Sequence, residues 1–374
     1  MKLSEFNFFS LQDENIALKP PYHRDECKLM VVHKRSETIE IFKQDADGNY
    51  LDGSNGEEKE FLQFKNVLDY FDEGDTFILN DTKVLPARLF GTKEKTDAQI
   101  EVFLLRELNT NLRLWDVLVE PARKIRIGNK LFFNDNSSIV AEVVDNTTSR
   151  GRTLRFLYEC DPDDFKKTLY AMGQAPLPQY ITNLRETEPE DLEDFQCIFA
   201  KNEGAVTVPG SGIHFSREMM KRMEIRDINT AYVTLHSSLS CFNEIEVEDL
   251  SKHKMDSEQM TVTEEACRII NKTRKSGHHL IAVGTSVVRA TETAVGTDGY
   301  LKEFDGWTSK FIFPPYRFTL ADSMICNFYH PLSTLLMTQC AFGGYDLIKE
   351  AYHQALENDF KFGCYGDAML ILND

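Results

Sequence analysis

Titratable and small polar residues follow three apolar runs that each predict a β-strand. They are Pro-Gly-Ser-Gly at 209–212 with His214, His236 on its own, and Gly-Thr-Ser at 284–286. Because open α/β sheets bind their ligands at the carboxyl ends of strands, these turns predict a ligand site. His214 and His236 are the candidate general acids or bases, since imidazole titrates near neutral pH.

The third turn also offers groups that bind an anion. Gly284 and Thr285 begin a predicted helix, whose first amides and hydroxyls suit a carboxylate or a ribose oxygen. Arg289, about one turn further on, has a guanidinium fork that matches a carboxylate. The residues alone leave a second interpretation open, in which the turns are structural and His214 is a hydrogen-bonded core histidine.

Two further stretches place polar side chains among apolar ones. Asn80, Asp81 and Arg88 lie where one predicted domain meets the next, a usual position for a ligand cleft. We expect Asp81 to orient a ribose or an amine. Near the end of the chain, aromatic residues alternate with hydroxyls and an amide, which suits a purine or a flipped base and equally suits a buried core. The candidates there are Tyr316, Asn327, Ser333 and Thr334.

Several common chemistries lack their motifs in this chain. It has no Gly-x-x-x-x-Gly-Lys-Ser/Thr, no Gly-x-Gly-x-x-Gly after a strand, no Gly-x-Ser-x-Gly and no His-Glu-x-x-His. The nine histidines show no metal-ligand spacing and the eight cysteines form no Cys-x-x-Cys, so no metal site is predicted. Scattered cysteines predict buried, reduced thiols.

Turn and capping signals predict two domains. Between residues 81 and 159, short strands follow one another with polar turns between them, which predicts a small inserted antiparallel β-barrel. Residues 1–80 and 160–374 alternate strands and helices, which predicts a discontinuous α/β domain. Asp161-Pro162 and Thr263 indicate helix starts within it.

The predicted barrel differs in charge from the rest of the chain. The net charge of −18 works against nonspecific binding to nucleic acid or to anionic membranes. Residues 121–156 nevertheless hold seven basic and only three acidic side chains. They form either solvated strand faces or a surface for phosphate groups. The residues predicted to contact nucleic acid are Arg123, Lys124, Arg126, Arg150 and Arg152.

Nothing in the sequence indicates a membrane protein. No apolar run approaches the roughly 18–20 residues of a membrane helix. The first residues, Met-Lys-Leu-Ser-Glu-Phe, lack the apolar stretch of a secretory signal. We therefore expect a cytoplasmic protein that does not bind membranes, and the sequence leaves its oligomeric state open.

Short motifs run in one order along nearly the whole chain. They are Asn-Asp-Thr-Lys-Val-Leu-Pro-Ala-Arg-Leu-Phe-Gly at 80–91, Pro-Leu-Pro-x-Tyr-Ile at 176–181, Thr-Leu-His at 234–236, His-Lys-Met-x-Ser-Glu at 253–258, Val-Gly-Thr at 283–285, Asn-Phe at 327–328, Ser-Thr-Leu-Leu-Met at 333–337 and Tyr-Gly-Asp-Ala-Met at 365–369. In this order they resemble the S-adenosylmethionine:tRNA ribosyltransferase-isomerase family (QueA) of queuosine biosynthesis.

The resemblance implies a fold and a reaction. The fold is an α/β domain with a small inserted β-barrel. In the reaction, the ribosyl part of S-adenosylmethionine moves to the 7-aminomethyl group of a deazaguanine at the tRNA wobble position. An epoxycyclopentane forms as adenine and methionine leave, and the product is epoxyqueuosine. S-adenosylmethionine is therefore a consumed substrate, and neither a metal nor a further cofactor is implied.

Residue roles follow from the same resemblance. A base must remove a proton beside the sulfonium centre, and His214 and His236 are the candidates. Arg289 is expected to hold the methionine carboxylate, and Tyr316 and Asn327 to face a base. The partner is the tRNA anticodon loop, whose phosphates the basic residues of the barrel would contact.

Pocket motifs depart from the family pattern. Where the family usually has Ala-Pro-Thr-Ala-Gly-Leu-His-Phe, this chain has Val-Pro-Gly-Ser-Gly-Ile-His-Phe at 208–215. Where the family usually has Leu-His-Val-Gly-Ala-Gly-Thr-Phe, it has Leu-His-Ser-Ser-Leu-Ser-Cys-Phe at 235–242. Side chains replace two glycines there, and they would occupy ligand volume. The alternative hypothesis is therefore a divergent paralogue that binds S-adenosylmethionine or a nucleoside but uses another acceptor or is not catalytic.

Overall fold

The computed structural model describes residues 1–45, 48–51, 59–133, 139–239 and 245–374. Residues 240–242 of the second departing motif lie outside the described residues. The chain forms two compact units. The α/β unit comprises residues 1–82, 196–202 and 208–374, and the barrel unit comprises residues 83–195 and 203–207.

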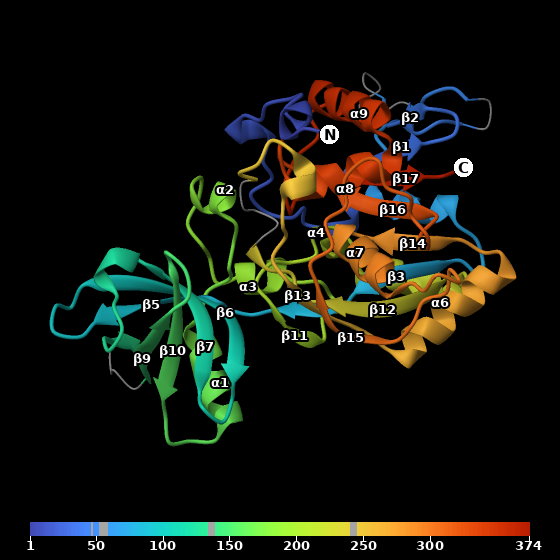
Figure 1. The fold of residues 1–374 in the computed structure, drawn as a ribbon. Helices are drawn as coiled ribbons and strands as arrows, with labels where there is room; N and C mark the ends of the chain where they lie inside the picture. The colour runs from blue at the N-terminus through green and yellow to red at the C-terminus, as the bar shows by residue number, and fades with distance from the viewer. Residues whose placement is uncertain (46–47, 52–58, 134–138, 240–244) are drawn as a thin grey trace. The chain divides into compact units, whose positions relative to one another are not determined.

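A nine-stranded mixed sheet forms the centre of the α/β unit (Figure 1). In sheet order its strands are β15 (Phe304–Thr308), β13 (Glu258–Val262), β12 (Asn229–Leu235), β3 (Thr76–Asn80), β14 (Leu280–Val283), β16 (Ser323–Asn327), β17 (Ala368–Leu372), β1 (Leu29–His33) and β2 (Thr38–Glu40). The pairs β12–β3, β3–β14 and β14–β16 are parallel. The central strands therefore end at one edge of the sheet.

Alternating side chains bury both faces of this sheet. On β3, Ile78 packs into the core on one face, whereas Phe77 and Leu79 pack into the core on the other. Successive residues of a strand point to opposite faces, so a sheet covered on both sides reads as a nearly continuous apolar run. The first core contains apolar residues of α6 (Glu264–Ser276), α7 (Thr285–Ala294), α8 (Thr334–Gly343) and α9 (Tyr345–Glu357). The second contains those of α5 (Arg217–Ile225) and the 3-10 helix η4 (Phe64–Tyr70).

Helix starts follow the capping signals in the sequence. The Asp161 carboxylate accepts a hydrogen bond from the Asp163 amide at the start of α1 (Pro162–Met172). Thr263 Oγ1 accepts one from the Ala266 amide at the start of α6. Both side chains satisfy amides that have no carbonyl partner in the first turn. Short helical elements complete the chain: α2 (Gln179–Thr182), α3 (Asp191–Asp194), α4 (Gly210–Ile213), η1 (Leu3–Phe6), η2 (Asp13–Asn15), η3 (Arg24–Glu26), η5 (Ala122–Lys124) and η7 (Leu250–Lys252).

One strand expected from the sequence differs in position. The apolar run at 205–208 predicts a strand, but the strand is β11 (Asn202–Ala205), which pairs with β4 (Thr82–Val84). Val206 and Val208 are buried without joining a ladder. The apolar pattern therefore identified their burial rather than their backbone conformation.

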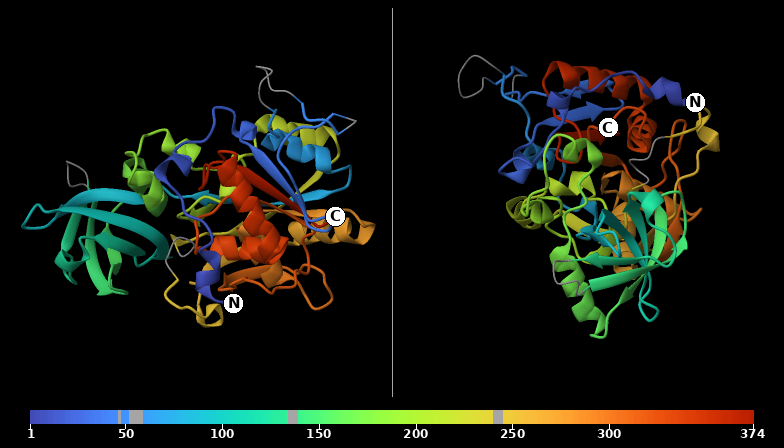
Figure 2. Two further views of the ribbon diagram at one scale, coloured as in Figure 1. Left: turned by 90° about the horizontal axis from the view of Figure 1, so that it is seen from above. Right: turned by 90° about the vertical axis from the view of Figure 1, so that its left-hand side faces the viewer.

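The barrel unit confirms the antiparallel barrel predicted from the sequence. Its closed strand order is β10 (Gly151–Leu157), β7 (Leu114–Glu120), β6 (Gln99–Asn109), β5 (Arg88–Lys93), β8 (Lys130–Phe133) and β9 (Ile139–Asn146), and Figure 2 shows these strands from two further directions. The unit continues past residue 159, the predicted boundary. Phe165 of α1 packs on Phe156 of the barrel, with ring centroids 5.2 Å apart. The division into independently folding domains stays a prediction.

No helix in the described parts of the chain is long and apolar enough to cross a membrane.

Candidate functional site

The carboxyl ends of β3 and β12 bring two of the sequence motifs together. The strands are parallel, with Val233 opposite Asn80. Residues 80–82 therefore leave the sheet beside residues 234–236, as expected for polar turns at one edge of an open sheet. This edge of the α/β unit is the candidate site.

Asn80 braces this edge from inside. Its Oδ1 accepts hydrogen bonds from the amides of Leu235 (3.0 Å) and Thr82 (3.2 Å). Its Nδ2 donates to the Leu235 carbonyl (3.0 Å) and to Ser286 Oγ (3.1 Å). The side chain is buried and uses the full hydrogen-bonding capacity of a carboxamide. This differs from the expected substrate contact: Asn80 joins β3, β12 and the start of α7.

Asp81 lies beside this brace in a network of hydroxyl and amide groups. Its Oδ1 accepts from Thr234 Oγ1 at 2.6 Å, and its Oδ2 accepts from Asn202 Nδ2 at 3.0 Å. Asn202 Nδ2 also lies 2.9 Å from Thr234 Oγ1. Two donors fix the orientation of the carboxylate, and each oxygen keeps a second lone pair for another group.

His236 is the half-buried titratable group at this edge. Its Nδ1 lies 2.8 Å from Thr82 Oγ1, and its backbone amide donates to the Gln259 carbonyl. Burial lowers the pKa of His236 below its ordinary value, and the Asp81 carboxylate opposes this shift. The imidazole is therefore neutral at pH 7 and able to accept a proton.

His214, the other predicted base, is enclosed in the core. Its Nδ1 lies 3.2 Å from Cys27 Sγ, and its Nε2 lies 3.3 Å from Asn327 Oδ1. Asn327 Nδ2 donates to the carbonyls of Gly363 and Cys364, so Oδ1 is left as the acceptor. We therefore assign the proton of His214 to Nε2, and Nδ1 accepts from the Cys27 thiol.

The contacts of His214 and Asn327 differ from the roles that the sequence suggested for these two residues. His214 is 1% exposed, and burial lowers its pKa to about 4. Its position matches the core-histidine interpretation that the residues left open. Asn327 is buried with both donors engaged, which differs from the expectation that it faces a base.

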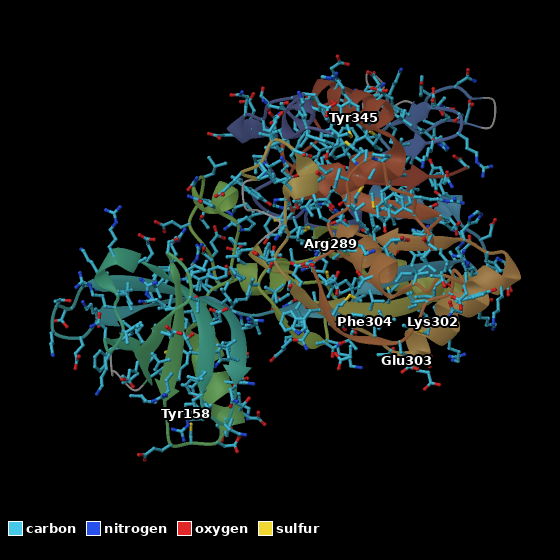
Figure 3. The ribbon with its side chains drawn as sticks, in the orientation of Figure 1. Tyr158, Arg289, Lys302, Glu303, Phe304 and Tyr345 are labelled. Carbon is cyan, nitrogen blue, oxygen red and sulfur yellow. The ribbon has the colours of Figure 1, made fainter. Side chains whose placement is uncertain are left out.

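Arg289 is buried in an ion pair that the sequence analysis missed. Its Nη1 contacts Glu258 Oε2, and its Nε donates to the Lys310 carbonyl at 2.8 Å. The other Glu258 oxygen accepts from the amide and hydroxyl of Ser238. Arg289 Nη2 is buried and has no hydrogen-bond partner among the described residues. Figure 3 marks Arg289 on α7. The sequence did contain one indication of this ion pair, because Glu258 is the last residue of the motif at 253–258.

The turns at 209–212 and 284–286 lie close to each other, next to Tyr329. Gly284 precedes α7 with φ of +95°, a backbone conformation that favours glycine. Ser211, from the Pro-Gly-Ser-Gly turn, lies close to it, since a β-carbon on Gly284 would lie 3.7 Å from Ser211 Oγ. Burial raises the pKa of Tyr329, and the nearby hydroxyls of Ser211 and Thr285 oppose this shift. Two of the three predicted turns therefore each place a hydroxyl near Tyr329.

Of the remaining residues predicted to bind ligands, Tyr316, Ser333 and Arg88 have structural partners, and the Thr334 hydroxyl has none among the described residues. Tyr316 donates to Glu292 Oε2 at 3.1 Å rather than presenting a free hydroxyl. Ser333 caps α8 through the Leu336 amide, and Thr334 Oγ1 is buried without a hydrogen-bond partner among the described residues. Arg88 belongs to the barrel unit, where it forms an ion pair with Glu101 at 3.0 Å.

The predicted nucleic-acid residues separate into three groups within the barrel unit. Arg123, Lys124 and Arg126 line one cavity. Arg150 is exposed but pairs with Glu120 at 3.5 Å. Arg152 is 6% exposed and donates to backbone carbonyls. The sequence had suggested a contact to nucleic acid, but this guanidinium is buried. No cluster of possible metal ligands occurs within the described ranges.

Buried, neutral His214 predicts acid sensitivity. Its pKa falls from 6.5 to about 4 on folding, so the unfolded chain binds the extra proton between these values. The stabilisation is present above pH 6.5 and is lost as the pH falls toward 4, by up to about 3 kcal/mol. We expect His214→Gln to lose this component of the pH dependence, measured by urea unfolding from pH 7 to pH 4. His279→Gln, at an exposed position, is the matched control. Equal pH dependence in wild type and His214→Gln would contradict the assignment.

This chain is similar to known proteins along nearly its whole length. The family described as "Queuosine biosynthesis protein" matches residues 3–371. A protein of Phocaeicola vulgatus named S-adenosylmethionine:tRNA ribosyltransferase-isomerase is 63% identical over 373 residues, covering 100% of both chains. One of Flavobacterium psychrophilum with the same name is 55% identical, again covering 100% of both.

A solved structure is also similar. The crystal structure of the S-adenosylmethionine tRNA ribosyltransferase from Thermotoga maritima has a TM-score of 0.52 and 27% identity, covering 98% of this chain and 100% of that one. The match over residues 3–371 and the full-length identity to two relatives place this chain in the queuosine biosynthesis protein family.

Proposed function

We propose that this protein is an S-adenosylmethionine:tRNA ribosyltransferase-isomerase of queuosine biosynthesis. The observation that carries the proposal is the 63% identity, from end to end, to a curated protein with that name. The altered motifs at 208–215 and 235–242 lie within the 373 residues over which this identity is found. The comparisons therefore do not favour the alternative hypothesis of a divergent paralogue that uses another acceptor or is not catalytic.

The substrates are S-adenosylmethionine and tRNA. The ribosyl group of S-adenosylmethionine is transferred to the 7-aminomethyl group of a deazaguanine in the anticodon loop, and adenine and methionine leave. S-adenosylmethionine is consumed as a substrate. The chain's own part in this reaction is to hold the two substrates, remove a proton beside the sulfonium centre and stabilise the resulting charges.

His236 is our candidate for the base. In the reactive form, Nδ1–H donates to Thr82 Oγ1, which leaves the Nε2 lone pair to accept the proton. Its lowered pKa keeps the imidazole neutral at pH 7, as this role requires. The Asp81 carboxylate, held by Thr234 and Asn202, stabilises the imidazolium that forms.

Arg289 is our candidate for binding the methionine carboxylate. Glu258 and the Lys310 carbonyl hold Nη1 and Nε, so the guanidinium has a fixed orientation. Nη2 remains available for a carboxylate oxygen. Burial strengthens such a contact because water does not compete for the donor.

The function is tested by incubating the purified protein with S-adenosylmethionine and tRNA that carries the 7-aminomethyl-7-deazaguanine precursor. We expect release of adenine, measured by chromatography, in an amount equal to the modified tRNA. Transcript without the precursor is the control. Absence of adenine release from the precursor-bearing tRNA would remove the proposal.

His236→Gln is expected to lower the rate of adenine release by about 10²–10⁴-fold, the usual contribution of general base catalysis. In the wild-type protein, the rate is expected to fall as the pH drops through the lowered pKa of His236, because the protonated imidazole no longer accepts a proton. His279→Gln serves as the control. A variant with wild-type rate and pH profile would assign the base elsewhere.

Arg289→Lys is expected to raise the KM for S-adenosylmethionine by about 10–100-fold. Lysine keeps the positive charge but loses the planar fork, and a hydrogen bond to a charged group contributes about 1.5–3 kcal/mol. Arg268→Lys, on the exposed face of α6, is the matched control. Thermal melting confirms that both variants fold. An unchanged KM in a folded Arg289→Lys variant would exclude this role.

A further inference from the structure

The barrel unit contains a cavity of about 560 Å³ with an unusual lining. Its size falls within the roughly 300–1,000 Å³ of typical ligand pockets. Four of its seven lining residues are cations and none is acidic; the lining consists of Lys93, Thr96, Ala98, Arg123, Lys124, Arg126 and Asn129.

Two separate segments of the unit, residues 93–98 and 123–129, build the cavity wall. Arg123 and Lys124 belong to η5, and Arg126 follows before β8. Lys93 ends β5 and donates through Nζ to the Lys124 carbonyl at 2.8 Å. Asn129 Oδ1 accepts from the Arg126 amide at 2.9 Å and closes the turn. The backbone that carries the cations is therefore held on both sides.

Arg152 supports this wall from inside the unit. Its Nη2 donates to the Ala122 carbonyl at 2.8 Å and its Nε to the Ile125 carbonyl at 3.1 Å, one on each side of Arg123 and Lys124. Its Nη1 donates to the Gly151 and Thr148 carbonyls. A buried guanidinium that spans four carbonyls restricts the backbone of 122–125, because a moved carbonyl would leave a buried donor unpaired.

Most other basic residues of the same unit pair with a carboxylate, whereas the cations of the cavity do not. Within the described residues, no ion pair involves Lys93, Arg123, Lys124 or Arg126. Among the described residues of the unit, eight other basic side chains pair with a carboxylate, whereas Lys95, Arg113, Lys130 and Arg152 do not. The eight are Lys83, Arg88, Arg106, Arg150, Arg155, Lys166, Lys167 and Arg185. Four cations gathered without counter-charge, in a protein of net charge −18, point to an anionic ligand.

We propose that this cavity binds backbone phosphate groups of the tRNA substrate, and that Arg152 is the positioning residue for its cations. The guanidinium groups of Arg123 and Arg126 match phosphate oxygens in a bidentate geometry, whereas Lys93 and Lys124 act as point charges. The inference rests on the proposed function for the identity of the nucleic acid. It adds Lys93 to the contacts and removes Arg150 and Arg152.

The test measures tRNA binding by fluorescence anisotropy between 50 and 200 mM salt, without S-adenosylmethionine. Each phosphate contact contributes roughly 0.7–0.9 to the slope of log K against log salt. Lys93→Gln with Arg126→Gln removes two contacts, so we expect the slope to flatten by about 1.4–1.8. Affinity at 0.1 M salt should fall roughly 25–60-fold for the same reason.

Arg155→Gln with Lys167→Gln is the matched control. It removes the same net charge from the same unit, but these residues pair with Glu142 and Asp164 and do not line the cavity. We expect its slope and affinity to equal those of the wild type. An equal loss of affinity in both double variants would overturn the proposal, as would a wild-type slope in Lys93→Gln/Arg126→Gln.

Arg152→Lys tests the positioning role separately. It keeps the charge, yet an ammonium group cannot span the same four carbonyls. We expect a flatter salt slope in a variant that remains folded by thermal melting, since misplaced cations make fewer simultaneous contacts. A folded Arg152→Lys variant with the wild-type slope would refute the positioning role.

The two proposals fail in distinguishable ways. A wild-type protein that releases adenine, combined with a Lys93→Gln/Arg126→Gln variant that binds tRNA normally, would refute the cavity and leave the function intact. A wild-type protein that releases no adenine would refute the function, whereas a salt slope that flattens only in the cavity variant would still assign the cavity to RNA phosphates.

Discussion

The candidate site depends on the carboxamide of Asn80. This one side chain hydrogen-bonds to both backbone groups of Leu235, to the Thr82 amide and to Ser286 Oγ. It thereby fixes the ends of two neighbouring strands and the start of α7 relative to one another. His236 follows Leu235 directly, and Asp81 lies between Asn80 and Thr82. The titratable groups of the site therefore take their positions from an uncharged residue that reacts with nothing.

Local sequence signals predicted most of the architecture. Caps at Asp161 and Thr263 marked helix starts because a side-chain acceptor next to a helix acts within three residues. Short strands between polar turns predicted the barrel because hairpin connections are local too. The alternation of strands and helices predicted an α/β domain with a ligand site at strand ends, and the parallel order of the central strands was found only in the structure.

The roles of individual polar residues were less predictable because they depend on partners far along the chain. His214 is enclosed by Cys27 and Asn327, which lie 187 and 113 residues away. A histidine after a glycine-rich turn looks the same in the sequence whether its neighbours are solvent or core. Arg152 likewise resembles Arg150 in the sequence, yet one guanidinium is buried against carbonyls and the other is exposed. Burial decides between these outcomes, and only the assembled fold sets burial.

The pairing of β3 with β12 has a consequence for the order of folding. These neighbouring strands are joined by the segment that forms the whole barrel, and the contact between Asn80 and Leu235 spans 155 residues. Closing so long a loop costs more chain entropy than closing any barrel hairpin. Pairing between β1 and β17 spans the chain further still: Leu29 pairs with Ala368, and beside this pair the Lys28 amide donates to the Asp367 carboxylate, 339 residues away. Contact order therefore predicts that the local hairpins of the barrel form early and that the central sheet, which bears the candidate site, is completed late by contacts of high sequence separation.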